Sequence, residues 1–346
     1  MRTLLITLFL MSFACLTAQV RKPGPSKKLE NAKNDCITIT GADGVALTVL
    51  DIVELLVGPG VEYSNVSFQA VLGGDNEASI GMFDGNACNP IGFDQGVILS
   101  SGTVGNALGP NEFDDITAAL GLPGDAGLDA LTGGIPTLDA TVLEFDFIPN
   151  DNAIFIQYVF GSEEYNEYIG AIFNDVFGFF VNGQNIALIP GTNTPVAINN
   201  INNGFATEGE FASGPCTNCE YYRDNADLQN PPYEIECDGL TTVLTATAMV
   251  LPNETNTVKL AIADAGDDAW DSWVFIRVES FSTIIQVPGD ANCDGEVDVL
   301  DVVTIINYIL GFNPDPFCPE NADANEDGDI DVLDVVTTIN IILSGE

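Results

Sequence analysis

The feature that most constrains the fold is an internal repeat near the C-terminus. A twelve-residue acidic segment, DANCDGEVDVLD at 290–301, returns 33 residues later as DANEDGDIDVLD at 323–334. A short apolar stretch follows each copy, at 302–310 and 335–343, and its composition and length indicate a helix. The repeat therefore predicts a small module built from two units, each a loop followed by a helix.

The oxygen-bearing side chains of each copy have the spacing of a calcium loop. Calcium takes six to eight oxygen ligands, and a twelve-residue loop supplies them from positions 1, 3, 5, 7, 9 and 12, with glycine at position 6 for the turn. Position 7 contributes its carbonyl, and Asp at position 12 is shorter than the usual Glu, so a modified helix entry is needed for bidentate binding. The predicted ligands are Asp290, Asn292, Asp294, Glu296, Asp298 and Asp301 in the first loop, and Asp323, Asn325, Asp327, Asp329, Asp331 and Asp334 in the second.

Two calcium ions are therefore expected, and folding of the module is expected to depend on them, because each loop crowds several carboxylates against a small apolar unit. The alternative is a pair of solvated acidic turns. A tandem of two complete loops argues against it.

The two units resemble a type I dockerin domain, over residues 288–346. The resemblance implies docking to a cohesin-type protein domain, often in polysaccharide degradation or at a cell surface. It places the partner contacts at loop positions 10 and 11, which here are apolar rather than the hydroxyl pair of many dockerins, so the class of partner stays open. The near identity of the copies implies that either helix can be presented; the alternative is that the two leucines pack the core. These positions are Val299, Leu300, Val332 and Leu333.

Residues 36–287 have a different pattern, in which short alternating segments lie between clusters of Gly, Asn, Asp and Pro. Such segments predict strands. One helix is predicted at 47–57, where Gly58-Pro59-Gly60 ends the apolar periodicity. We therefore expect a mainly β fold, a two-sheet, jelly-roll-like β-sandwich. The predicted strands are 141–148, 153–160, 176–181, 242–250, 257–263 and 272–278.

Several stretches of this region are similar to the choice-of-anchor L domain of exported bacterial proteins. Together they span most of residues 45–282. The resemblance implies a β-rich secreted or surface domain, with the dockerin as its anchor. The matching stretches are 96–102, 161–165, 174–180, 189–192, 260–267 and 271–272.

The N-terminus has the pattern of an export signal. A charged start, an apolar run from Leu4 to Leu16 and a small residue at Ala18 predict a signal peptide at 1–18, followed by a basic leader at 19–35. The formal net charge is −42, and only three of the nine Lys and Arg residues come after the leader. Such a surface repels nucleic acid and anionic lipid, and no membrane span is expected. We expect a secreted or cell-surface bacterial protein.

Cysteine usage also indicates an oxidising compartment. The expected pairs are Cys36 with Cys88 and Cys293 with Cys318, and a further disulfide is expected within the trio Cys216, Cys219 and Cys237. A zinc site at this trio is the alternative. Seven cysteines follow the predicted signal peptide, so one thiol is left over.

The chain has no histidine, which excludes His-based triads and His-ligated zinc. A carboxylate pair of the glycosidase kind, from Glu163, Glu164, Glu167 and Asp175, is the remaining catalytic alternative. We expect binding or adhesion rather than catalysis; a glycoside hydrolase and a structural surface or matrix protein are the two alternatives.

Two further candidate sites lie in the large region. A second calcium site is predicted between two strands, with an acidic turn as the alternative. Glu163, Glu164 and Tyr165 are predicted to bind a ligand, either by joining this metal site or by lining a carbohydrate groove. The predicted second site consists of Asp264, Asp267, Asp268 and Asp271.

Overall fold

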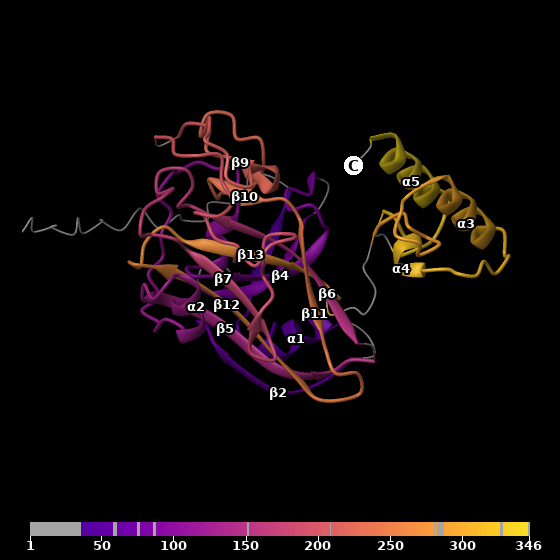
Figure 1. Ribbon diagram of the computed structural model, residues 1–346, viewed down its shortest axis with the longest axis horizontal. Helices are drawn as coiled ribbons and strands as arrows, with labels where there is room; N and C mark the ends of the chain where they lie inside the picture. The colour runs from indigo at the N-terminus through magenta and orange to yellow at the C-terminus, as the bar shows by residue number, and fades with distance from the viewer. Residues whose placement is uncertain are drawn as a thin grey trace, which may run out of the picture.

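The computed structural model describes residues 36–344 apart from 58–60, 75–76, 86–87, 151, 208, 280, 282–286 and 326–327. The predicted signal peptide and basic leader lie outside these residues. The strands of the large domain form one body and three C-terminal helices form another (Figure 1).

Two antiparallel sheets make up the large domain, which is the predicted two-sheet β-sandwich. The first sheet has the order β1-β3-β4-β13-β6-β10-β9, with β11 paired to β6, and the second has the order β2-β5-β12-β7-β8. The first sheet contains β1 (Thr38–Gly41), β3 (Ile80–Asp84), β4 (Gln95–Ser100), β6 (Ala153–Ser162), β9 (Tyr222–Asp224), β10 (Gly239–Thr241), β11 (Leu244–Met249) and β13 (Ser272–Arg277). The second contains β2 (Glu62–Gln69), β5 (Thr137–Ile148), β7 (Val176–Val181), β8 (Gln184–Asn185) and β12 (Asn256–Ala265). All six predicted strands are confirmed.

Both faces of the first sheet are buried at its central strand β13. Successive side chains of a strand point to opposite faces. Val274 and Ile276 accordingly pack in the core between the two sheets, while Trp273 and Phe275 join a second apolar cluster on the other face. Every residue of β13 is therefore buried. Phe281, which follows this strand, contacts aromatic rings of the second sheet and extends the core.

The predicted helix of the large domain is α1 (Val49–Val57). Its five buried residues, at positions 49, 52, 53, 56 and 57, form one face and join the core between the sheets. The start is fixed by a reciprocal contact in which the Thr48 amide donates to the Asp51 carboxylate at 2.7 Å and the Asp51 amide donates to the Thr48 hydroxyl at 3.3 Å. A second helix, α2 (Ala126–Leu131), covers part of the outer face of the second sheet.

The C-terminal body contains the two helices predicted after the repeats, α3 (Val299–Ile309) and α5 (Val332–Ser344), together with the short α4 (Pro319–Ala322). Both long helices begin three residues before the predicted start. In α3 the Asp298 carboxylate caps the helix by accepting from the Leu300 amide at 2.6 Å, so the last residues of the loop already belong to the first turn. A small core centred on Ala291, Ile305 and Ala322 holds the helices together.

Three disulfides confirm the expected pairing. Cys36 bonds Cys88, Cys293 bonds Cys318, and Cys216 bonds Cys219. The leftover thiol is Cys237, which is buried. Because two thiols of the trio are joined to each other, the alternative of a zinc site at this trio is wrong.

Candidate calcium loops and docking surface

The first loop is closed by its last residue, Asp301. This side chain is fully buried, and its two oxygens accept from the Asn292 amide at 3.0 Å and the Asp298 amide at 2.8 Å. Asp290 accepts from the Asp294 and Gly295 amides at 3.1 and 3.0 Å. The short Asp at position 12 thus reaches back over the loop from the first turn of α3.

The second loop repeats this geometry. Asp334 is also fully buried and accepts from the Asn325 amide at 3.1 Å and the Asp331 amide at 2.7 Å. The glycines at position 6, Gly295 and Gly328, have φ of +87° and +89°, which only glycine adopts readily. Asp327 lies outside the described residues.

The donors of the first loop suit calcium. Burial raises the pKa of the Asp301 carboxyl, and the nearby carboxylates of Asp290 and Asp294 raise it further. The buried carboxylate of Asp301 therefore lies close to other negative charges. A divalent cation would offset both the cost of burying this carboxylate and its repulsion by Asp290 and Asp294. The donor set offers oxygen only, as calcium and magnesium prefer. At position 9, the Asp298 side chain already caps α3, which favours its reaching an ion through water.

The predicted partner-contact residues are exposed, and the two copies agree closely. Val299 and Val332 are 65% and 64% exposed, and Leu300 and Leu333 are 56% and 57% exposed. The alternative that these leucines pack the core is therefore wrong. One turn further along, Val303 and its counterpart in α5 are both 49% exposed. Each helix carries an apolar patch at its start.

The predicted second metal site is divided by the structure. Asp264, near the end of β12, and Asp271, just before β13, are each 1% exposed, whereas Asp268 is exposed and Asp267 is half-buried. Asp175, which the prediction left out of this site, is buried beside them. Burial raises the pKa of Asp264 well above its usual range, and the carboxylates of Asp175 and Asp271 raise it further.

Glu163, Glu164 and Tyr165 follow β6 and are fully buried. The Tyr165 hydroxyl donates to the Ile201 carbonyl at 2.8 Å, as a tyrosine packed in a core does. Burial raises the pKa of Glu163, and the carboxylates of Asp238 and Glu236 raise it further. A sugar chain has no access to side chains without exposed surface, so these three residues line no carbohydrate groove in this structure.

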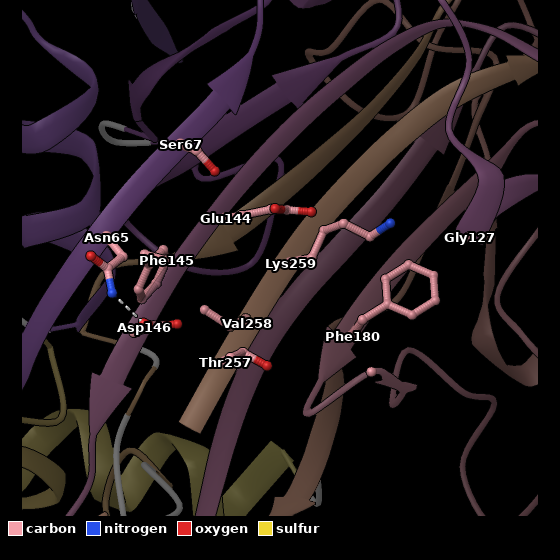
Figure 2. A pocket seen from close by; sticks show the side chains of 11 residues that line it. Asn65, Ser67, Gly127, Glu144, Phe145, Asp146, Phe180, Thr257, Val258 and Lys259 are labelled. Carbon is pink, nitrogen blue, oxygen red and sulfur yellow. Dashed lines mark hydrogen bonds between the residues drawn. The ribbon is translucent and has the colours of Figure 1, made fainter. Parts of the chain in front are cut away.

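An open groove lies instead on the outer face of the second sheet (Figure 2). It has a volume of about 370 Å³ and crosses four neighbouring strands. Lys259 of β12 and Glu144 of β5 project into it beside the ring of Phe180, and the Asn65 amide donates to Asp146 at 2.6 Å along its edge. The sequence prediction did not find this groove, because its residues come from strands far apart in the chain.

Comparisons with known proteins agree with this division of the chain. The family model of the choice-of-anchor L domain matches residues 43–282, and that of the dockerin type I domain matches residues 288–343. No curated protein and no solved structure matches the chain. Among the described residues, no helix has the length and apolar character needed to cross a membrane.

The two matches carry coarse functional information. Dockerin type I domains bind calcium and dock to cohesin domains, and both kinds of domain are typical of extracellular or cell-surface proteins. The first match covers more than half of the chain, from the helix α1 to the end of the core. The chain therefore belongs to the choice-of-anchor L domain family and carries a dockerin type I domain at its C-terminal end.

Proposed function

We propose that this protein is an exported bacterial binding or adhesion protein that attaches, through its calcium-loaded dockerin, to a cohesin-bearing partner in a polysaccharide-degrading or cell-surface assembly. Each calcium loop binds one ion through the six residues named for it above. The ions hold the loops against the starts of α3 and α5, and the helix starts present the apolar patches to the cohesin.

The observation that carries this proposal is the matched exposure of the two patches. An apolar side chain that faces water forgoes the stabilisation that burial would give, about 25 cal/mol for each Å² of apolar surface. Leu300 and Leu333 nevertheless face water to the same extent in both copies. Duplicated exposed patches on a pseudo-twofold module support docking through either helix, with one partner bound at a time.

The test is capture of the full chain by a panel of immobilised cohesin domains, in calcium and in excess chelator. We expect capture by at least one cohesin in calcium only. Either Leu300→Asp or Leu333→Asp alone should leave capture within about threefold of the parent, and the two together should abolish it. Leu251→Asp, at an apolar site of the large domain that is 54% exposed, is the matched control.

Capture that persists in chelator would contradict the calcium dependence. Failure to bind any cohesin in calcium would favour the alternative in which the whole chain is a structural surface or matrix component and the loops only stabilise it.

For the large domain we propose carbohydrate binding at the groove of Figure 2. An aromatic ring beside charged and amide side chains offers a sugar both an apolar surface and hydrogen bonds. Glycan-array binding without turnover, lost in Phe180→Ala, is the expected result. Release of reducing sugar that disappears in Glu163→Gln or Glu164→Gln would instead favour the glycoside hydrolase.

A further inference from the structure

Buried acidic side chains gather where β6 and β12 end and β10 and β13 begin. We distinguish two sets of oxygen donors there. The Asp264 group consists of Asp175, Asp264 and Asp271, and the Glu163 group consists of Asn111, Glu163 and Asp238. All six side chains are at most 1% exposed. The groups lie close together, since the Glu163 amide donates to the Asp271 carbonyl at 3.1 Å and the Ser272 hydroxyl, next in the chain to Asp271, donates to Asp175 at 2.7 Å.

Both groups contain oxygens that accept no hydrogen bond. In the Asp264 group these are both carboxylate oxygens of Asp264. The Ser101 hydroxyl is close enough to lower the pKa of this carboxyl, but it does not reach hydrogen-bonding geometry. Asp175 and Asp271 are held in place around it, because the Ser272 hydroxyl donates to Asp175 at 2.7 Å and the Ala118 amide donates to Asp271 at 3.0 Å.

In the Glu163 group, one oxygen of each member has no partner: Oε1 of Glu163, Oδ2 of Asp238 and Oδ1 of Asn111. The orientation of the Asn111 amide is fixed, since its nitrogen donates to the Asn225 carbonyl at 3.0 Å and to Asp238 at 2.6 Å. Its oxygen must therefore face a donor or a cation. Unlike a carboxylate, the amide of Asn111 does not take up a proton, so protonation cannot supply a partner for its oxygen.

Leaving such acceptors buried and unpaired costs about 1 to 3 kcal/mol each, and more when they are charged. The three Lys and Arg residues of the described part of the chain have other partners. Lys259 pairs with Asp125 at 2.7 Å, Arg223 donates to main-chain carbonyls, and Arg277 donates to Gln157. A cation from solution, protons or ordered water can supply the missing partners.

We propose that this end of the sandwich binds calcium, with one ion in the Asp264 group and one in the Glu163 group. The donors are all oxygens, come from segments far apart in the chain and are at most 1% exposed, which suits a hard divalent cation. Within the described residues, no three carboxylates bring their oxygens within 4.8 Å of one another here, and neither do those of the first calcium loop. In the sandwich groups, as in the first calcium loop, a bound calcium ion would draw the like-charged carboxylates closer together than they lie without it.

This ligand set differs from the one expected from the sequence. Asp264 and Asp271 remain, Asp175 replaces the two acids of the exposed turn, and Glu163 joins a second ion with partners that are remote in the chain. An ion in each group ties the loops before β10 and β13 to the end of β6, and so locks this end of the sandwich.

The first experiment is calcium content of the full chain after equilibration in calcium buffer and gel filtration. We expect two more ions per chain than the dockerin loops hold. Asp264→Asn and Glu163→Gln should each lose one ion, while Asp268→Asn, a matched change in the exposed turn, should lose none. A variant that keeps its ion overturns the assignment for that group, and a chain that holds only the dockerin ions overturns both.

The second experiment reads the sandwich alone. Both tryptophans, Trp270 and Trp273, lie at this end of it, and the dockerin has none. Saturating calcium should raise the temperature at which tryptophan emission reports unfolding by about 5 °C or more over chelator. Asp264→Asn has the shape of a protonated Asp264. If the group holds protons instead, the wild-type shift will be absent and this variant will be as stable as wild type.

Terbium supplies a readout that needs no variant to fold. Terbium bound near an indole should emit when tryptophan is excited, and excess calcium should quench this emission; no sensitised emission would overturn the proposal.

The full chain with Asp301→Ala and Asp334→Ala separates this proposal from docking. It should lose cohesin capture but keep the tryptophan shift. Loss of the shift in that variant would assign the calcium effect to the dockerin and overturn the site in the sandwich.

Discussion

The disulfide between Cys293 and Cys318 is expected to set the calcium affinity of the dockerin. Cys293 is position 4 of the first calcium loop, and Cys318 is the residue before α4, so the bond ties the loop to the short helix that packs beside it. The perturbation is the full chain with Cys293→Ser and Cys318→Ser together, which avoids leaving one free thiol.

The size of the effect follows from the length of chain that the bond closes. With a sequence separation of 25, loss of the cross-link lets the unfolded module gain conformational entropy. The chain-entropy relation puts this at about 3.5 kcal/mol at room temperature. That corresponds to about a 300-fold shift of the folding equilibrium toward the unfolded module. Because the loops bind calcium only when folded, the product of the two calcium dissociation constants should rise by as much as this factor.

The assay is a calcium titration of the full chain followed by the helical circular dichroism signal, to which α3 and α5 contribute most helical residues. The variant should need more calcium than the parent to reach the same helical signal. Cys216→Ser with Cys219→Ser is the matched control, because that bond spans a separation of only 3 in the large domain and its loss should leave the titration unchanged. A double Cys293→Ser and Cys318→Ser variant with parental calcium affinity would refute the reasoning.

Three further outcomes follow from the large domain. Burial raises the pKa of the Cys237 thiol well above its usual value, so the oxidised chain from residue 19 onward should show no thiol reactive toward a disulfide reagent until it is unfolded, and then one. A Cβ at Gly102 would lie 1.8 Å from the Asp271 carboxylate, so Gly102→Ala should cost about 1 to 3 kcal/mol of stability by tryptophan-monitored urea unfolding, whereas Gly74→Ala, with open space around it, should cost little. The Asp125 carboxylate caps α2 and binds Lys259, so Asp125→Ala should cost about 1 to 2 kcal/mol in the same assay, and an unchanged midpoint would contradict the role of the cap.

Local chemistry determined much of this protein from the sequence alone. The calcium loops depend on residues within twelve positions of each other, so the proposed donors, the glycines at position 6 and the helices after the loops follow from spacing. The strands from 141 onward alternate strongly or form continuous apolar runs, and the helix α1 shows its buried face in its periodicity. The strands β1 to β4 and β8 to β10 were not predicted. For β8, β9 and β10 the reason is their length, because two or three residues carry no periodicity.

Tertiary structure alone decided which polar groups meet. The sequence placed Asp264, Asp267, Asp268 and Asp271 together because they are neighbours along the chain, but Asp264 and Asp271 are buried, whereas Asp267 is half-buried and Asp268 is exposed. Asn111 and Asp238 meet Glu163 only because three loops converge at one end of the sandwich. Packing likewise decided the exposure of Leu300 and Leu333. From sequence alone, an apolar residue at the start of a helix is compatible with either a core or a docking surface. Only the position of the facing helix distinguishes the two.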